Sequence, residues 1–265
     1  MLHAMNETAA QPLGRYADVN GLKMYYEIHG EGFPLVLIHG GGSTITTTFG
    51  RVLPSLAKTH KVIAVEMQAH GHTADIDRPL SFEQDADDIA ELLRQLKISK
   101  ANIFGFSNGA STTLQIAIRH PQIVNKIIVA STMYKRAGSY PWFWEMMANP
   151  EFEHMPQVYK DAYLAINPDK KALYAMYERD VARMQSFSDI SEDDIRSIAA
   201  PALIISGDKD VCSPEHAVEM YRNMKQATLM IFPGGHGDYI GEISTLKPGQ
   251  NNFPAVAVIE KFLTE

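Results

Sequence analysis

The residues best suited to chemistry are a serine and its flanking glycines at positions 105–109, which read Gly-Phe-Ser-Asn-Gly. Small residues two positions before and after Ser107 let a strand and a helix approach closely around a sharp turn. A serine on such a turn adopts a strained backbone conformation, and its hydroxyl stands at the amino end of the helix, where the dipole favours negative charge. We therefore expect Ser107 to attack a carbonyl carbon. So short a pattern also arises by chance, so its context must support this interpretation.

A second glycine-rich stretch, residues 39–42, reads His-Gly-Gly-Gly and follows an apolar run. Without a Cβ atom, consecutive glycines allow main-chain N–H groups to face a ligand directly. Together with the N–H of Asn108, they could bind the oxygen of a tetrahedral intermediate. The alternatives are a tight turn or a phosphate-binding loop. The nucleotide-binding glycine patterns are absent from this stretch, which disfavours the latter.

The elements that must position these residues follow an alternating pattern. A hairpin dipeptide, Asn20-Gly21, predicts two antiparallel strands within residues 15–27. Apolar runs without polar alternation predict six further strands, buried on both faces, at residues 35–38, 62–65, 102–106, 127–130, 203–205 and 229–232. Helical patterns lie between these runs, and Ser107 falls where one strand gives way to a helix. The fold class is therefore α/β, with a mainly parallel eight-stranded sheet flanked by helices.

Residues 133–200 interrupt the alternation and predict a helical cap inserted after the sixth strand. This segment contains 11 of the 24 aromatic residues and 6 of the 13 methionines. We expect some of these side chains to form the apolar roof of a substrate pocket: Trp142, Phe143, Trp144, Met146, Tyr159 and Tyr163. The alternative is that half or more of them form the core of the insertion itself. Arg136, Arg179 and Arg183 could meet a substrate carboxylate, but we expect them at the surface.

These patterns divide the chain into a flexible tail at residues 1–14, a core at 15–132 and 201–265, and the cap at 133–200. The net charge of −7 disfavours nucleic-acid binding, which needs a basic face. No apolar run approaches the roughly 18 residues of a membrane span. The single cysteine, Cys212, excludes an internal disulfide and a cysteine-based metal site. No signal peptide is visible, which favours a cytoplasmic location.

Five segments together resemble the α/β-hydrolase fold superfamily, from about Tyr16 to the end of the chain. They are residues 39–42, 70–73, 105–109, 207–210 and 234–236. The resemblance implies a triad in the order nucleophile, acid, histidine, which corresponds here to Ser107, Asp210 and His236. Asp208 lies in the same loop as Asp210 and resembles a structural residue. The resemblance also makes Gly41 and Asn108 the oxyanion-hole donors, with Gly42 as the second choice to Gly41.

The activity implied by this resemblance is that of a serine hydrolase with a small-molecule substrate. An acyl-enzyme on Ser107 would cleave a small or medium ester, thioester or lactone with an apolar acyl group. Carbon–carbon bond hydrolysis, acyl transfer and perhydrolysis on the same triad are alternatives. A non-catalytic ligand receptor that keeps the fold is a further one. No cofactor or metal is implied. Residues 66–72 depart from the usual pattern of the family, so no subfamily follows.

Overall fold

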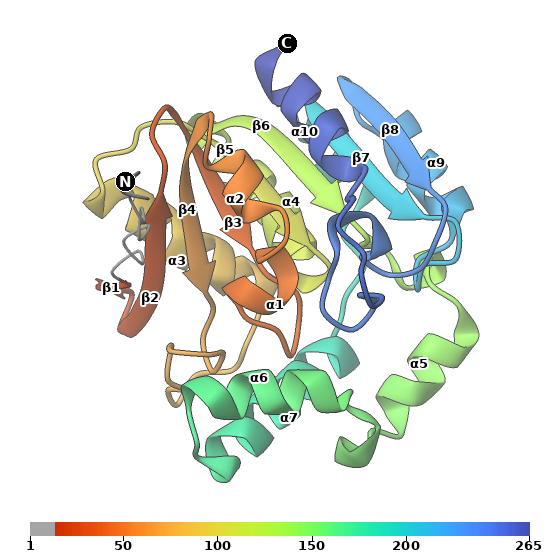
Figure 1. Cartoon of the computed structure of the whole chain (residues 1–265). Helices are drawn as coiled ribbons and strands as arrows, with labels where there is room; N and C mark the ends of the chain where they lie inside the picture. The colour runs from red at the N-terminus through yellow and green to blue at the C-terminus, as the bar shows by residue number, and fades with distance from the viewer. Residues whose placement is uncertain (1–13) are drawn as a thin grey trace, which may run out of the picture.

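The computed structural model describes residues 14–265, and the fold is built on one eight-stranded sheet (Figure 1). The strand order is β1-β2-β4-β3-β5-β6-β7-β8. β1 and β2 form the predicted hairpin, β2 is antiparallel to β4, and the remaining neighbours are parallel. The strand bounds are β1 (Arg15–Val19), β2 (Leu22–His29), β3 (Phe33–Ile38), β4 (His60–Glu66), β5 (Ala101–Phe106), β6 (Val124–Ala130), β7 (Ala202–Gly207) and β8 (Ala227–Phe232). The predicted tail lies outside the described residues, apart from Gly14.

Helices cover both faces of the sheet, which explains why its strands are apolar on both sides. In β3, Val36 and Ile38 pack toward one face and Leu35 and Leu37 toward the other. The first face is covered by α3 (Phe82–Gln95), α4 (Asn108–Arg119), α8 (Glu192–Ser197) and α9 (Pro214–Asn223). The second is covered by α1 (Ile45–Phe49), α2 (Leu53–Leu56) and α10 (Ala255–Thr264). The predicted α/β fold and its mainly parallel sheet are confirmed.

The segment between β6 and β7 contains the predicted helical insertion. Its helices α5 (Pro141–Ala148), α6 (Gln157–Ile166) and α7 (Lys170–Gln185) lie beyond the carboxyl ends of the parallel strands (Figure 1). We call these three helices and their connections the helical insertion. The later helix α8 instead packs with α4 and α9, and its Ile195 is fully buried in the main core.

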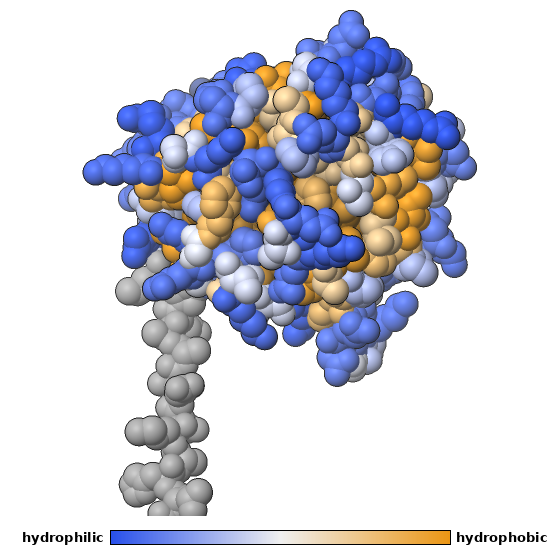
Figure 2. All heavy atoms as spheres, turned by 90° about the horizontal axis from the view of Figure 1, so that it is seen from above, coloured by the Kyte–Doolittle hydropathy of each residue, from blue (hydrophilic) through white to orange (hydrophobic). Residues whose placement is uncertain are grey.

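The opposite end of the molecule, seen from above in Figure 2, carries polar residues with apolar groups between them. In a parallel sheet, ligands bind at the carboxyl ends of the strands. A ligand site is therefore expected on the side that faces the helical insertion.

Within residues 14–265, no helix combines the length and the apolar character that crossing a bilayer demands.

Candidate active site

Ser107 lies at the turn between β5 and α4, in the geometry that its flanking glycines predict. Its φ of 55° and ψ of −121° place a non-glycine residue in a strained region. A Cβ atom on Gly105 would lie 2.0 Å from the carbonyl oxygen of Gly109, and one on Gly109 would lie 2.1 Å from that of Ile38. Both glycines are therefore required for strand and helix to meet around Ser107.

His236 follows β8 and is paired with Asp210, which follows β7. The Nδ1 atom of His236 lies 2.6 Å from Oδ1 of Asp210. Burial lowers the pKa of His236, but the carboxylate of Asp210 outweighs this and raises the pKa above its usual value. Burial raises the pKa of Asp210, but His236 and the hydrogen bonds to its carboxylate bring the pKa below its usual value. The pair therefore favours a charged carboxylate and a more basic imidazole.

The imidazole of His236 lies beside the turn that holds Ser107. Its ring centroid is 4.8 Å from that of Phe106, the residue before the serine. Among the described residues, the Ser107 hydroxyl makes no hydrogen bond, so Ser107 and His236 are not joined by one in this structure. Such bonds are frequently long without substrate and tighten when it binds.

Two further residues that the sequence did not indicate support Asp210. Its Oδ2 atom accepts a hydrogen bond from the hydroxyl of Ser131, which also lies 2.5 Å from the phenol oxygen of Tyr239. Ser131 directly follows β6 and has a φ of 54°.

Asp208 does not contact His236 in this way. Its Oδ1 atom accepts the N–H of Gly234 at 2.8 Å. Asp208 thus ties together the loops that carry Asp210 and His236.

The main-chain donors predicted to bind an oxyanion surround Ser107. Within the described chain, the N–H groups of Gly41 and Asn108 have no acceptor, whereas the N–H of Gly42 donates to Asp180 at 2.6 Å. A Cβ atom on Gly41 would lie 2.4 Å from Nδ2 of Asn108, so glycine is required there. Gly41 and Asn108 therefore have N–H groups available for a ligand, and the Gly42 N–H is occupied.

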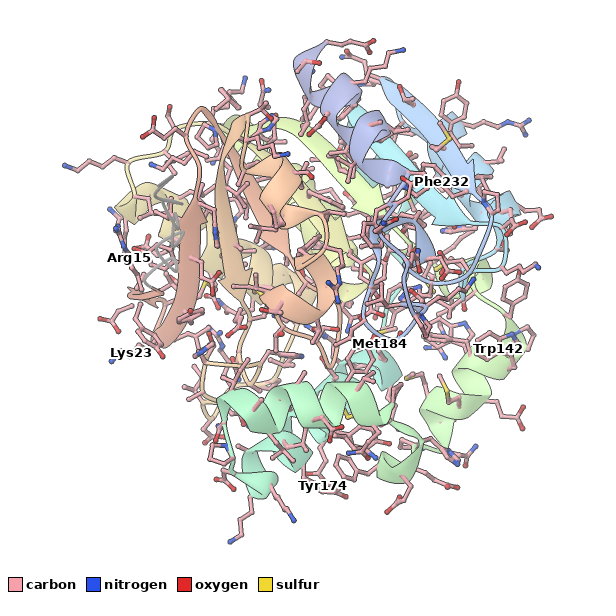
Figure 3. The ribbon with its side chains drawn as sticks, viewed as in Figure 1. Arg15, Lys23, Trp142, Tyr174, Met184 and Phe232 are labelled. Atoms are coloured by element: carbon pink, nitrogen blue, oxygen red, sulfur yellow. The ribbon has the colours of Figure 1, made fainter. Side chains whose placement is uncertain are left out.

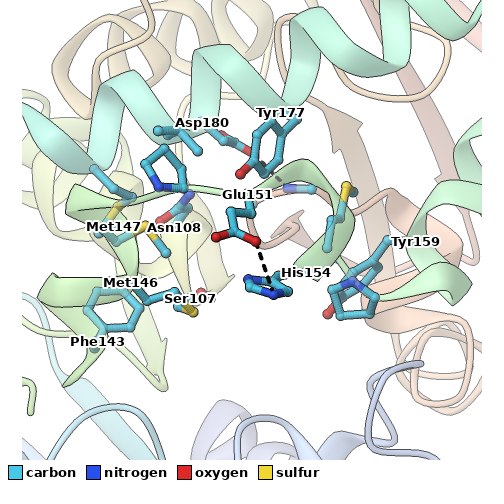
Figure 4. Close-up of a pocket in the computed structure, with 17 residues that line it drawn as sticks. Ser107, Asn108, Phe143, Met146, Met147, Glu151, His154, Tyr159, Tyr177 and Asp180 are labelled. Carbon is cyan, nitrogen blue, oxygen red and sulfur yellow. Dashed lines mark hydrogen bonds and ion pairs between the residues drawn. The ribbon is translucent and has the colours of Figure 1, made fainter.

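A cavity of about 260 Å³ opens between Ser107 and the helical insertion (Figure 4). Its wall combines apolar side chains with a few polar ones. The lining residues from the insertion are Phe143, Met146, Met147, Pro150, Glu151, His154, Met155, Pro156, Tyr159, Tyr177, Asp180, Val181 and Met184. Among the predicted roof residues, Phe143, Met146 and Tyr159 line this cavity.

The other predicted roof residues lie elsewhere. Trp142 is 51% exposed and lies on the outer side of α5 (Figure 3). Trp144 packs against Phe187, and its indole N–H donates to the carbonyl of Arg136. Tyr163 is buried in a separate cluster with Met176. Tyr163 therefore fits the alternative, in which half or more of these side chains form the core of the insertion itself.

The predicted surface position of Arg183 is wrong, since its side chain is buried between Asp85 and Asp180. The sequence patterns did not indicate a role for Asp180. This residue follows Leu173 and Met176 at helical spacing, so a charged residue lies on the buried face of α7. A charge at a position that the helical period assigns to the core could have identified it.

The comparisons with known proteins agree with this architecture. The family described as alpha/beta hydrolase fold matches residues 34–159. The crystal structure of the enol-lactonase from Burkholderia xenovorans LB400 has a TM-score of 0.73 at 23% identity. It covers 94% of this chain and 100% of that one. The family match and the structural likeness together show that the chain has the α/β-hydrolase fold.

Two proteins named as hydrolases are similar to this chain in sequence. The human serine hydrolase BPHL is 28% identical over 238 residues, which cover 82% of this chain and 77% of that protein. The 2-hydroxymuconate semialdehyde hydrolase of Pseudomonas sp. (strain CF600) is 33% identical over 132 residues. These cover 47% of this chain and 46% of that protein. Both of these proteins are named as hydrolases, and a further similar protein, 30% identical over 250 residues, is named as the acetyltransferase component of the acetoin cleaving system of Pseudomonas putida.

Proposed function

We propose that the protein is a serine hydrolase that cleaves a small or medium ester, thioester or lactone through an acyl-enzyme. The observation that carries this proposal is the 2.6 Å pair of His236 and Asp210 beside a serine on a strained turn. His236 takes the proton from Ser107 as the hydroxyl attacks the carbonyl carbon. Asp210 holds the imidazole with Nε2 toward the serine and stabilises the imidazolium that forms.

The negative oxygen of the tetrahedral intermediate binds to the N–H groups of Gly41 and Asn108. The intermediate collapses when His236 returns the proton to the leaving alcohol, thiol or lactone oxygen. A water molecule then attacks the acyl-enzyme with His236 again as the base, and the acid is released. No step in this sequence needs a metal or a cofactor.

In this proposal the helical insertion acts as a cap that selects the acyl group. Phe143, Met147 and Met184 belong to the apolar part of the cavity lining. Figure 4 shows Phe143 and Met147 on the side of Ser107. Methionine side chains adapt their shape to the ligand, so the cavity suits flexible aliphatic chains. An apolar acyl group that enters it is removed from water, which contributes about 0.8 kcal/mol for each CH₂ buried.

The described lining of the cavity offers no lysine or arginine to pair with an anionic acyl group, which favours a neutral one. Among the residues of the described chain that line it, Asp180 and Glu151 are acidic, and none is a lysine or arginine. The muconate semialdehyde named for the Pseudomonas relative carries a carboxylate, which needs a cationic partner when it is buried. Arg183 is close by, but Asp85 and Asp180 already bind its guanidinium. Carbon–carbon bond hydrolysis of such acids is therefore disfavoured here.

The experiment that tests the proposal is labelling with a fluorophosphonate, followed by turnover of a panel of p-nitrophenyl esters. One label per chain is expected on Ser107, and Ser107→Ala should remove both labelling and turnover. Ser111→Ala is a matched control, since Ser111 lies one turn further along α4 and binds Thr132 instead. Labelling that persists in Ser107→Ala would disprove the assignment. Labelling without turnover of any ester would support the receptor alternative.

A further inference from the structure

The loop that carries the proposed oxyanion donors is held from the insertion side by one carboxylate. Asp180 extends from α7, and its Oδ2 atom accepts the N–H of Gly42 at 2.6 Å. The same oxygen lies 2.9 Å from Nε2 of His70, and Oδ1 accepts from the guanidinium of Arg183. The side chain of Asp180 is only 14% exposed. A residue of the insertion therefore fixes the orientation of the Gly41–Gly42 peptide in the core.

The contacts of His70 favour a ring that carries both protons. Nδ1 lies 2.8 Å from the carbonyl oxygen of Gln68, which can only accept, and Nε2 faces the Asp180 carboxylate. Burial lowers the pKa of His70, but Asp180 outweighs this and raises it. A protonated Nε2 cannot accept the N–H of Gly42 that lies 3.2 Å away. The carboxylate of Asp180 is consequently the true acceptor of that N–H.

The charged groups around the contact between Asp180 and Gly42 nearly cancel. Asp180 and Asp85 are the two carboxylates, and Arg183 and the His70 imidazolium are the two cations. Burial raises the pKa of Asp85 to about 6, while nearby Asp88 is bound by Arg78 at 2.6 Å. The ring of His39 lies 4.9 Å from that of His70 and stays neutral, because burial lowers its pKa to about 3.

We infer that Asp180 is a positioning residue for the oxyanion hole. It occupies the N–H of Gly42 and so leaves the N–H of Gly41 as the donor that works with Asn108. This inference rests on the proposed function. A bare carboxylate this close to the hole would oppose the developing oxyanion, so His70 and Arg183 must neutralise it. When His70 loses its proton as the pH rises past its raised pKa, the neutralisation is incomplete and kcat should fall.

The test compares Asp180→Ala, Asp180→Asn and a matched control, Arg179→Gln. Arg179 is the preceding residue on α7 and binds Asp75 at 3.0 Å, so its loss also loosens the insertion but does not touch the Gly42 loop. In Asp180→Ala, kcat for p-nitrophenyl butyrate should fall about 100-fold with less than about a threefold change in KM, as for a misplaced oxyanion donor.

Asp180→Asn keeps an acceptor for Gly42 but loses the charge. Compared with Asp180→Ala, this variant should restore kcat to within about tenfold of the wild type, because an acceptor again orients the Gly42 N–H and the oxyanion hole keeps its geometry. It should also abolish this fall in kcat with rising pH, since neutral asparagine no longer holds the His70 proton. Equal losses of kcat in Arg179→Gln and Asp180→Ala would overturn the inference, because the effect would then come from docking of the insertion alone.

A second readout does not depend on turnover. In protein labelled with ¹⁵N-glycine, hydrogen exchange of the Gly42 amide should accelerate at least tenfold in Asp180→Ala and stay slow in Arg179→Gln. If the exchange behaves in this way but the wild-type protein cleaves no ester, the proposed function is disproved and the positioning of Gly42 by Asp180 stands. Unchanged exchange at Gly42 in Asp180→Ala would disprove the positioning role whatever the activity.

Discussion

The hydroxyl of Ser131 donates a hydrogen bond to the carboxylate of Asp210, which lies 79 residues further along the chain. Ser131 directly follows β6, and Asp210 follows the neighbouring β7. Parallel strands bring their carboxyl ends to one edge, so residues just beyond neighbouring strands can meet there. The bond fixes one carboxylate oxygen of Asp210 and leaves the other for His236, with which it makes the 2.6 Å contact.

Removing the Ser131 hydroxyl should therefore weaken catalysis without abolishing it. A hydrogen bond to a charged group contributes about 1.5–3 kcal/mol, so Ser131→Ala should lower kcat about tenfold or more. Ser206→Ala is the control, because the hydroxyl of Ser206 lies 3.4 Å from the same oxygen and contributes less. Measurements of kcat and of the melting temperature for both variants would show whether Ser131 supports catalysis or only stability. Equal effects of both substitutions would show that Ser131 has no special role.

The assignment of the acid can be tested by comparing Asp210→Asn with Asp208→Asn. Asp210→Asn should leave the fold intact and lower kcat by roughly 10⁴-fold, since the imidazole loses its orientation and its counter-charge. Asp208→Asn should mainly lower the melting temperature, because Asp208 holds the N–H of Gly234. Melting curves and kcat would separate the two effects. A stable but inactive Asp208→Asn variant would transfer the acid role to Asp208.

The pH dependence of kcat/KM should report the titration of His236. The base must be neutral, and Asp210 raises its pKa above the usual 6.5, so activity should fall as the pH drops through a midpoint above 6.5. Activity falls at low pH because the charged imidazolium cannot accept a proton from Ser107. In Asp210→Asn, an NMR titration of His236 should give a lower pKa. A flat profile of kcat/KM down to pH 4 would exclude a histidine base.

The length of the acyl chain should matter, because the cavity beside Ser107 is mostly apolar. Butyrate to octanoate esters should have a higher kcat/KM than acetate, by up to ~0.8 kcal/mol for each CH₂ buried. Phe143→Ala should reduce the preference for octanoate. Trp142→Ala should not, since Trp142 is exposed on the outer side of the same helix. A steady decline in kcat/KM from acetate upward would show that the acyl site is small or polar.

Much of the fold and of the candidate site could be predicted from the sequence because local rules determine it. Residues buried on both faces of a strand must be apolar, so the parallel strands stood out as apolar runs. The steric demands of the turn made Gly105 and Gly109 recognisable, and their positions identified Ser107. Asp210 and His236 follow consecutive strands of the sheet, so the topology alone brings their loops to the same edge.

The tertiary structure decided what the helical insertion contributes. Its helices are rich in aromatic and methionine residues, so helical period alone did not distinguish the side that faces Ser107 from the side that faces solvent. Docking of α5 and α7 against the core placed Phe143 at the cavity and Trp142 outside it. The same docking brought Asp180 to Gly42, across 138 residues of chain. A buried charge needs its partner in space, and the partner of Asp180 lies in another element, where no local pattern can show it.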